Sequence, residues 1–270
     1  MPQLAGRRSG PYYADAAGQV TETTDDTLLA GRLTLRQSRH GHRAGTDAVL
    51  LASAIASDAA GCAVDAGAAS GAAGLMLAAR APGLKVDLVE INADESALAA
   101  YNIAANGFVD RMRVITADLL AHEAAREAAG LVKGAADIII TNPPFLREGA
   151  ARVSPDPARA RAHAWPDDGL TRWCRTLAWL ASADAQLAMI HRADALHDIM
   201  KALEGRFGAL AIRPIHPRID EPATRIIITA RKASRTPLRL LPPLILHKAD
   251  GQFTPLAAAL HAGQASLSIA

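Results

Sequence analysis

The sequence predicts an α/β protein with a seven-stranded, mostly parallel sheet, one antiparallel strand and helices on both faces. Short apolar segments of strand type alternate along most of the chain with longer segments of helical periodicity, which is typical of a parallel sheet. Near the C-terminal end, two strand-like segments follow each other with only a short loop between them. That arrangement predicts an antiparallel hairpin at the far side of the sheet.

The chain is expected to form one large domain with small additions at both ends. Residues 1–24 are small, polar and rich in turn-forming types, which predicts a mobile arm. The other expected parts are an N-terminal strand and helix at 25–60, the main domain at 61–255 and a C-terminal tail at 256–270.

Each expected element has a local reason. Residues 31–37 alternate leucines with polar side chains, as a half-buried strand does, and the apolar helix at 46–57 begins at Thr46 or Asp47, either of which can cap it. The helix at 93–107 opens with two acidic residues and closes with Asn-Gly, which suits the helix dipole and the C-cap. The remaining expected strands are 62–67, 85–92, 111–118, 136–142, 185–191, 223–232 and 238–248, and the remaining expected helices are 68–81, 120–130, 169–182 and 195–208.

Composition narrows the class of protein. With 270 residues, 50% of them hydrophobic, the chain can bury one large core. Its two cysteines are far apart and in no metal-ligand spacing, which predicts a reducing compartment and no metal site. No apolar segment approaches the roughly 20 residues that span a bilayer, and the first residues do not resemble a secretory signal. We therefore expect a cytoplasmic protein with no membrane partner.

Two segments are locally basic although the formal net charge is only +2. Residues 32–43 hold four arginines, two histidines and no acid, and residues 213–239 hold seven basic side chains against two acidic ones. Basic faces of this kind attract phosphate. Arginines that simply keep a surface hydrated are the alternative interpretation, and both stay open at this point.

A turn of small residues, VDAGAASGAAG at 64–74, follows the first strand of the expected sheet and opens a helix. Gly67, Gly71 and Gly74 allow a ligand to approach the backbone closely. The next strand ends at Glu90, which is 23 residues after Gly67 and is placed to bind ribose hydroxyls. The pairing fits either a dinucleotide or S-adenosylmethionine.

A second informative stretch is DIIITNPPFLREG at 137–149. Three consecutive isoleucines are typical of a strand buried on both faces, and two prolines cannot continue such a strand because they lack the ladder N–H. A rigid turn with an amide, two prolines and an aromatic ring therefore lies at the carboxyl end of a parallel strand. Ligands bind at that edge in open α/β sheets.

Together these residues resemble the class I S-adenosylmethionine-dependent methyltransferases, which have a Rossmann-like fold, over residues 31 to about 255. The resemblance implies that Asp65 and the loop after it form the pocket for the methionine and ribose. It also implies that Glu90 holds the ribose hydroxyls and that Asp118 meets the adenine amine of the cofactor. The implied cofactor-binding loop residues are Asp65, Gly67, Ala69 and Gly71.

Asn142-Pro143-Pro144-Phe145 resembles the signature of methyltransferases that act on a planar amine. Such an amine is a poor nucleophile because its lone pair is conjugated with the ring. The Asn142 oxygen and the Pro143 carbonyl can each accept one N–H bond and direct the lone pair at the methyl group, while Phe145 stacks on the ring. Asn142 is also expected to touch the cofactor, and Pro144 to touch the substrate. An ordinary Pro-rich turn that ends a strand is the alternative.

The segment before the first βα unit resembles that of the bacterial tRNA adenine-N6 methyltransferases. The matching residues are Gln37, Gly41, His42, Arg43, Gly45, Thr46, Asp47, Leu50 and Leu51. The resemblance implies that Thr46 and Asp47 close over the methionine end of the cofactor. Both residues can also serve only as helix caps, and the two roles are compatible.

The substrate implied by the resemblance is RNA, with adenine N6 in tRNA as the best match. Arg147, Arg159 and Arg161 lie in a polar loop after the signature, which is expected to be a lid or a loop that binds the RNA backbone. Alternatives are a guanine-N2 rRNA methyltransferase and an RNA-binding protein that binds the cofactor without turnover. A monomer is favoured.

One departure from the family pattern affects the cofactor loop. Ala69 stands where the central glycine of the first motif usually lies. If this position has a positive φ, alanine costs roughly 1 kcal/mol or more relative to glycine. A weakened cofactor site is the expected consequence.

Overall fold

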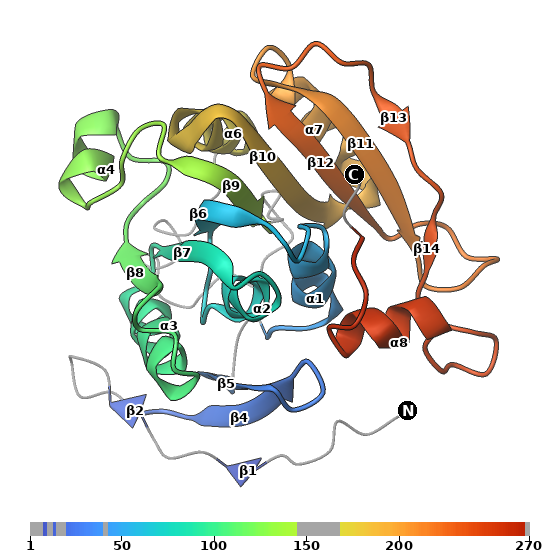
Figure 1. The fold of residues 1–270 in the computed structure, drawn as a ribbon, viewed down its shortest axis with the longest axis horizontal. Helices are drawn as coiled ribbons and strands as arrows, with labels where there is room; N and C mark the ends of the chain where they lie inside the picture. The colour runs from blue at the N-terminus through green and yellow to red at the C-terminus, as the bar shows by residue number, and fades with distance from the viewer. Residues whose placement is uncertain (1–7, 10–12, 15–19, 40–42, 145–167, 268–270) are drawn as a thin grey trace, which may run out of the picture.

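A computed structural model describes residues 8–9, 13–14, 20–39, 43–144 and 168–267. Its centre is a nine-stranded sheet with the order β13-β11-β12-β10-β9-β6-β7-β8, in which β14 also pairs with β11 (Figure 1). The strands of this sheet are β6 Ala60–Ala66, β7 Gly83–Glu90, β8 Met112–Thr116, β9 Ala136–Thr141, β10 Ala181–Arg192, β11 Phe207–His216, β12 Arg225–Lys232, β13 Arg239–Leu240 and β14 Leu244–Ile245.

The seven long strands confirm the expected mostly parallel sheet with one reversed strand. Strands β8, β7, β6, β9 and β10 pair in parallel with their neighbours, whereas β12 runs antiparallel to both β10 and β11. Strands β13 and β14 have two residues each and pair in parallel with β11. The carboxyl ends of the parallel strands therefore meet at one edge, which is where the functional residues were expected.

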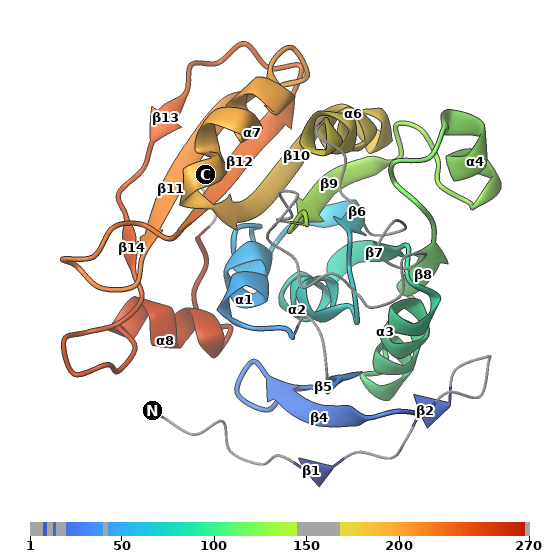
Figure 2. The ribbon, with the colours of Figure 1, turned by 180° about the vertical axis from the view of Figure 1, so that it is seen from behind.

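Helices cover both faces of the sheet (Figures 1 and 2). One apolar cluster joins α1, α2, α3 and α8 to the sheet, and the other joins α6 and α7 to its opposite face. The three isoleucines of β9 divide between these layers, because Ile138 and Ile140 belong to the first cluster and Ile139 to the second. The helices are α1 Thr46–Ser53, α2 Ala72–Arg80, α3 Ala93–Ala105, α4 Glu123–Ala128, α6 Gly169–Leu180, the 3-10 turn Ala193–Ala195, α7 Leu196–Leu203 and α8 Pro255–His261.

The prediction of which two segments form the C-terminal antiparallel pair was wrong. The antiparallel partner of β12 is β11, a strand that the sequence analysis assigned partly to a helix, and residues 238–248 contribute only β13 and β14. Strand β11 contains a glycine and a proline, and its register with β12 shifts between Gly208 and Ala211. A bulge and a proline weaken the strand pattern in a sequence.

A hairpin outside the main sheet was also missed. Strand β4, Thr23–Leu28, pairs antiparallel with β5, Leu33–Ser38, and the expected boundary at residue 24 falls inside β4. Three short strands lie N-terminal to it: Arg8–Ser9 pairs with β4, and Tyr13–Ala14 pairs with Val20–Thr21. The sequence of β4, TTDDTL, has little apolar content, so it lacks the usual strand signal.

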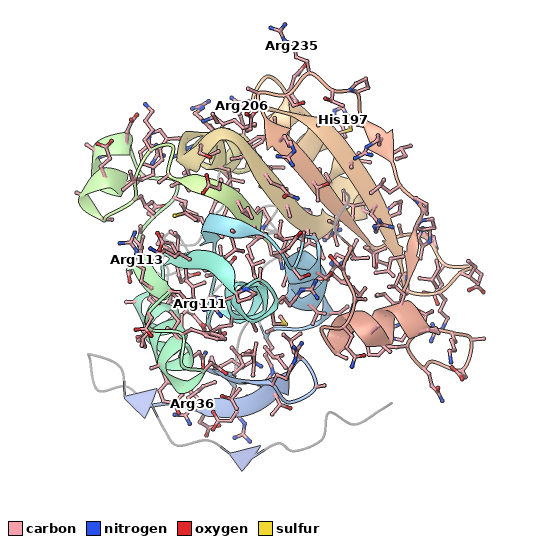
Figure 3. All side chains as sticks on the ribbon, in the orientation of Figure 1. Arg36, Arg111, Arg113, His197, Arg206 and Arg235 are labelled. Carbon is pink, nitrogen blue, oxygen red and sulfur yellow. The ribbon has the colours of Figure 1, made fainter. Side chains whose placement is uncertain are left out.

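Asn102 of α3 and Asn106, the C-cap residue of that helix, attach this hairpin to the domain. Asn102 accepts a hydrogen bond from the backbone N–H of Arg36 and donates one to its carbonyl, and Asn106 makes the same pair of bonds with Thr34. The two asparagines are four residues apart and point the same way. They bond the backbone N–H and C=O groups at the edge of β5, as a neighbouring strand would. In Figure 3, Arg36 lies beside α3, consistent with its guanidinium stacking on Tyr101.

The C-terminal segment packs back onto the start of the domain. Arg32 donates to the carbonyls of Ala262 and Gly263, and Arg80 donates to that of Ala265. The segment expected to be a tail, 256–270, therefore contains most of helix α8, and the residues directly after that helix are hydrogen-bonded to the domain. Within the described residues, no helix is both long enough and apolar enough to cross a membrane.

Candidate active site

The polar residues expected to act together end neighbouring strands of the parallel part of the sheet. Asp65 lies near the end of β6, Glu90 ends β7, Asp118 follows β8 by two residues, and Asn142 directly follows β9. Strand register places these ends side by side, because Ala66 pairs with both Val89 and Thr141. The expected gathering at one edge of the sheet is therefore present.

Asp65 holds the loop instead of opening toward a ligand. Its side chain is 2% exposed, and Oδ2 accepts a hydrogen bond from the backbone N–H of Gly74 at 2.8 Å. Burial raises the pKa of Asp65 to about 7, the Gly74 bond opposes that rise, and the charge of Glu90 adds to it. The carboxyl group thus fixes the first turn of α2 to the end of β6.

The loop between β6 and α2 has a left-handed backbone at three positions. Gly67 has φ 78°, Ala69 has φ 47° and Gly71 has φ 90°. A side chain at Gly71 would also lie 2.8 Å from the Cδ1 atom of Leu88. The positive φ on which the expected strain at Ala69 depends is present, and it is a conformation that favours glycine.

Glu90 organises this loop from the next strand. Its Oε2 accepts the backbone N–H of Ala69 at 2.9 Å, and its Oε1 accepts that of Asn92 at 2.8 Å. Asn92 in turn caps α3 by accepting from the N–H groups of Asp94 and Glu95. Burial, followed by the charges of Glu90 and Asp94, raises the pKa of Glu95 to about 7. A carboxylate oxygen has room for further donors, so Glu90 can still receive hydroxyl groups.

Asp118 is exposed, and its Oδ1 accepts the backbone N–H of Leu120 at 2.7 Å. Neighbouring elements hold the loop that follows it by bonds to its carbonyls. Arg126 of α4 donates to Leu119 and Ala121, Arg172 of α6 to Leu120, and Thr176 of α6 to Leu119. The free side of Asp118 therefore projects from a firmly held loop.

The expected signature turn contains a buried acceptor without a partner. Oδ1 of Asn142 is inaccessible to solvent and has no hydrogen-bond partner among the residues that the structure describes. Pro143 is buried and Pro144 is exposed. A buried amide oxygen without a donor costs about 1–3 kcal/mol, and such an atom is typical of a place that a ligand completes.

Thr141 and Trp173 support the turn, and sequence analysis missed both. The indole Nε1 of Trp173 donates to Oγ1 of Thr141 at 3.1 Å, and Thr141 donates to the carbonyl of Ala66 at 2.8 Å. Thr141 directly precedes the signature, and this position in the sequence could have identified it as a residue of the site. Trp173 is an apolar position on α6 that only the tertiary structure brings to the site.

Thr46 and Asp47 have different surroundings from those expected. Helix α1 is capped by Gly45, so neither Thr46 nor Asp47 is the N-cap residue, and that prediction was wrong. Glycine is itself a tolerated N-cap because it adopts extended backbone easily. Asp47 forms an ion pair with Arg225 at 2.9 Å, at the start of β12. Since β12 is antiparallel, this pair lies at the same edge of the sheet as Asn142.

The family segment before α1 is held by its own matching residues. Gln37 donates to Asp26 and accepts the backbone N–H of Ala44, while Arg43 donates to Thr24 and Asp26. These bonds attach residues 43–45 to the β4–β5 hairpin. The candidate residues Phe145, Arg147, Arg159 and Arg161, with the expected lid, lie outside the described residues.

Comparisons with known proteins agree with this arrangement. The family described as "Methyltransferase small domain" matches residues 41–155, which include the glycine loop and the signature turn. A tRNA1(Val) (adenine(37)-N6)-methyltransferase of Porphyromonas gingivalis is 29% identical over 226 residues, covering 79% of this chain and 84% of that protein. One of the same name from Trichodesmium erythraeum is 29% identical over 209 residues, covering 74% and 82%.

A solved structure extends the likeness over the whole fold. The crystal structure of a "predicted O-methyltransferase" from Agrobacterium tumefaciens has 32% sequence identity and a TM-score of 0.71, and the match covers 83% of this chain and 99% of that one. The sheet order, the acidic residues at neighbouring strand ends and these matches agree. The chain belongs to the Rossmann-like methyltransferases, and its residues 41–155 match the family described as "Methyltransferase small domain".

Proposed function

We propose that the protein transfers a methyl group from S-adenosylmethionine to the exocyclic N6 amine of an adenine in tRNA. The observation that carries this proposal is the buried Oδ1 of Asn142, which has no partner among the described residues. It lies at the carboxyl end of β9, beside the loop that Glu90 organises. An amine placed there would supply the missing donor.

The residues at the strand ends fit the cofactor. Glu90 and Asp118 offer carboxylate oxygens for ribose hydroxyls and for an adenine amine, while Asp65 is used within the protein. The cofactor supplies an electrophilic methyl group. The left-handed backbone at Gly67, Ala69 and Gly71 shapes the loop between the end of β6 and the start of α2.

The signature turn would prepare the acceptor. Oδ1 of Asn142 and the Pro143 carbonyl each accept one N–H bond from the amine, which turns its lone pair out of conjugation and toward the methyl donor. The nitrogen then loses a proton after transfer, so no strong base is required beforehand. Positioning and fixed dipoles therefore supply most of the rate enhancement.

RNA as the substrate is supported by the names of the curated relatives and by the segment around Arg43 that resembles theirs. A base must leave its stack to reach such a turn, so a loop of tRNA is the expected target. Activity on tRNA would place the protein in the cytoplasm.

The basic residues at 213–239 do not form one surface. Arg218 and Arg225 lie at the same edge as Asn142 and are paired with Glu221 and Asp47. Arg235 follows β12, at the opposite edge, and Figure 3 shows it near Arg206 and away from Arg36. Phosphate binding by this segment as a whole is therefore not part of the proposal.

The test is methyl transfer from labelled S-adenosylmethionine to unmodified tRNA and rRNA, followed by separation of the nucleosides. Label in N6-methyladenosine from tRNA is expected, whereas label in N2-methylguanosine would support the rRNA alternative. The Asn142→Ala variant should lose transfer while it keeps its affinity for S-adenosylhomocysteine. Asn106→Ala, the same change at the C-cap residue of α3 that bonds the hairpin, is the matched control and should keep turnover per folded molecule.

A further inference from the structure

We infer that Trp173 is a positioning residue that sets the distance between the methyl donor and the methyl acceptor. This inference rests on the proposed function for the identity of the two groups. Its basis is that one side chain of α6 packs against the loop after β6 and bonds Thr141, the last residue before the turn after β9. Trp173 is 6% exposed and touches neither reacting group directly in the proposal.

The first contact is a directed chain of hydrogen bonds. An indole N–H can only donate, so Oγ1 of Thr141 accepts from Trp173 and must use its own proton for the carbonyl of Ala66. Ala66 and Thr141 are register partners at the ends of β6 and β9. The chain thus ties together the last residues of the two strands, directly before Gly67 and Asn142.

The second contact is made by the indole ring. A Cβ atom added to Gly67 would lie 3.2 Å from Cη2 and 3.3 Å from Cζ2 of Trp173, so the ring packs closely beneath the first residue of the cofactor loop. The same side chain therefore supports the loop by its ring and the signature turn by its N–H. Neither turn can shift relative to the other without disturbing Trp173.

Methyl transfer is sensitive to this relationship because the donor and acceptor must be in line and in contact. A loosened Trp173 should slow the chemical step more than it weakens cofactor binding. A purely structural role would lower stability and leave turnover per folded molecule unchanged.

The experiment disrupts the chain of hydrogen bonds first at Trp173 and then at Thr141. Trp173→Phe loses the N–H and, because phenylalanine is shorter, also the ring atoms Cη2 and Cζ2 near Gly67. Thr141→Val keeps the shape of Thr141 and the indole ring, and loses only the hydroxyl with its two hydrogen bonds. Each should lower kcat about tenfold while the Kd for S-adenosylhomocysteine changes less than about threefold. Thr141→Ser should restore kcat. Trp179→Phe, the same change on the same helix, is the control that should keep it.

The double variant provides the decisive outcome. If both residues act through one chain of bonds, Trp173→Phe with Thr141→Val should have about the kcat of the slower single variant. Multiplied losses, or unchanged kcat in both single variants, would overturn the inference.

A measurement without RNA separates this inference from the proposed function. The chain has three tryptophans, so a nitrogen-15 spectrum holds three indole signals. The Trp173 signal should shift in Thr141→Val and again on addition of S-adenosylhomocysteine, while the Trp179 signal stays in place. If those shifts occur and no RNA is methylated, the proposed substrate is wrong, whereas the connection of Trp173 with Thr141 and the cofactor loop is supported. A Trp173 signal that S-adenosylhomocysteine leaves unmoved would overturn the link.

Discussion

The backbone N–H of Ala69 donates a hydrogen bond to Oε2 of Glu90 across 2.9 Å. This bond joins the loop after β6 to the end of β7, and it forms while Ala69 has φ 47°. The acidic residue expected to bind ribose hydroxyls therefore also holds the loop in its left-handed shape. If Glu90 binds the ribose hydroxyls as proposed, loop conformation and ligand binding depend on the same carboxylate.

Replacing Ala69 with glycine should stabilise the protein. Glycine adopts a positive φ without the steric cost of a Cβ atom, although it also gains freedom in the unfolded chain, so we expect a net increase of about 0.5–1 kcal/mol in the free energy of unfolding. Urea denaturation measures the change. Ala73→Gly, in the first turn of α2, is the control and should destabilise the protein. A loss of stability in Ala69→Gly would show that the loop is unstrained.

Replacing Glu90 with glutamine should weaken cofactor binding. Glutamine has one acceptor oxygen for the N–H groups of Ala69 and Asn92, and it has no charge to strengthen bonds from hydroxyl groups. The Kd for S-adenosylhomocysteine should rise about tenfold, as titration calorimetry can measure. Exposed Glu127 is the control for the same substitution.

Loss of the Glu90 charge should also lower the pKa of Glu95, since that charge is one cause of its rise to about 7.

The buried carboxyl of Asp65 predicts a pH dependence of stability. Its pKa rises from 3.8 to about 7 on folding, so the folded protein binds the proton more tightly than the unfolded chain does. The stability that this proton contributes is lost as pH rises toward the folded pKa. Asp65→Asn keeps an oxygen for the Gly74 N–H and cannot ionise. Its free energy of unfolding relative to the wild type should therefore increase between about pH 4 and about pH 7 and level off above that range.

The comparison with the variant is needed because other groups titrate in the same range. Burial lowers the pKa of His191 to about 4, so its contribution to stability is lost as pH falls below 6.5, opposite in direction to that of Asp65. His191 is present in both proteins and its effect cancels in the difference. A difference that stays flat across this range would mean that Asp65 ionises as freely in the folded protein as in the unfolded chain.

The ion pair between Asp47 and Arg225 makes it possible to test how Asp47 acts. If Asp47 contributes by holding the start of α1 to β12, then Asp47→Ala and Arg225→Ala should weaken S-adenosylhomocysteine binding to a similar degree, and the double variant should be little worse. Direct contact with the cofactor predicts a loss in Asp47→Ala alone. The pair is partly exposed, so each change should lower stability by no more than about 1 kcal/mol.

Local patterns were sufficient where an element is defined by its own residues. The isoleucines of β9, the acidic start of α3 and the prolines after Thr141 each have one favourable local structure, and all three were located correctly. Strands β4 and β11 were missed, because a polar hairpin strand and a bulged strand with a proline are stabilised by their partners instead of their own apolar pattern.

The sequence by itself determined that acidic and amide groups would end neighbouring parallel strands, because parallel strands align their carboxyl ends wherever βα units repeat. Only the tertiary structure decided what each group touches. It assigned Asp65 to Gly74, Asp47 to Arg225 and the indole of Trp173 to Thr141, and it left Oδ1 of Asn142 without a donor among the described residues. Those contacts join segments far apart in the chain, and their hydrogen-bond geometry depends on packing that no local pattern encodes.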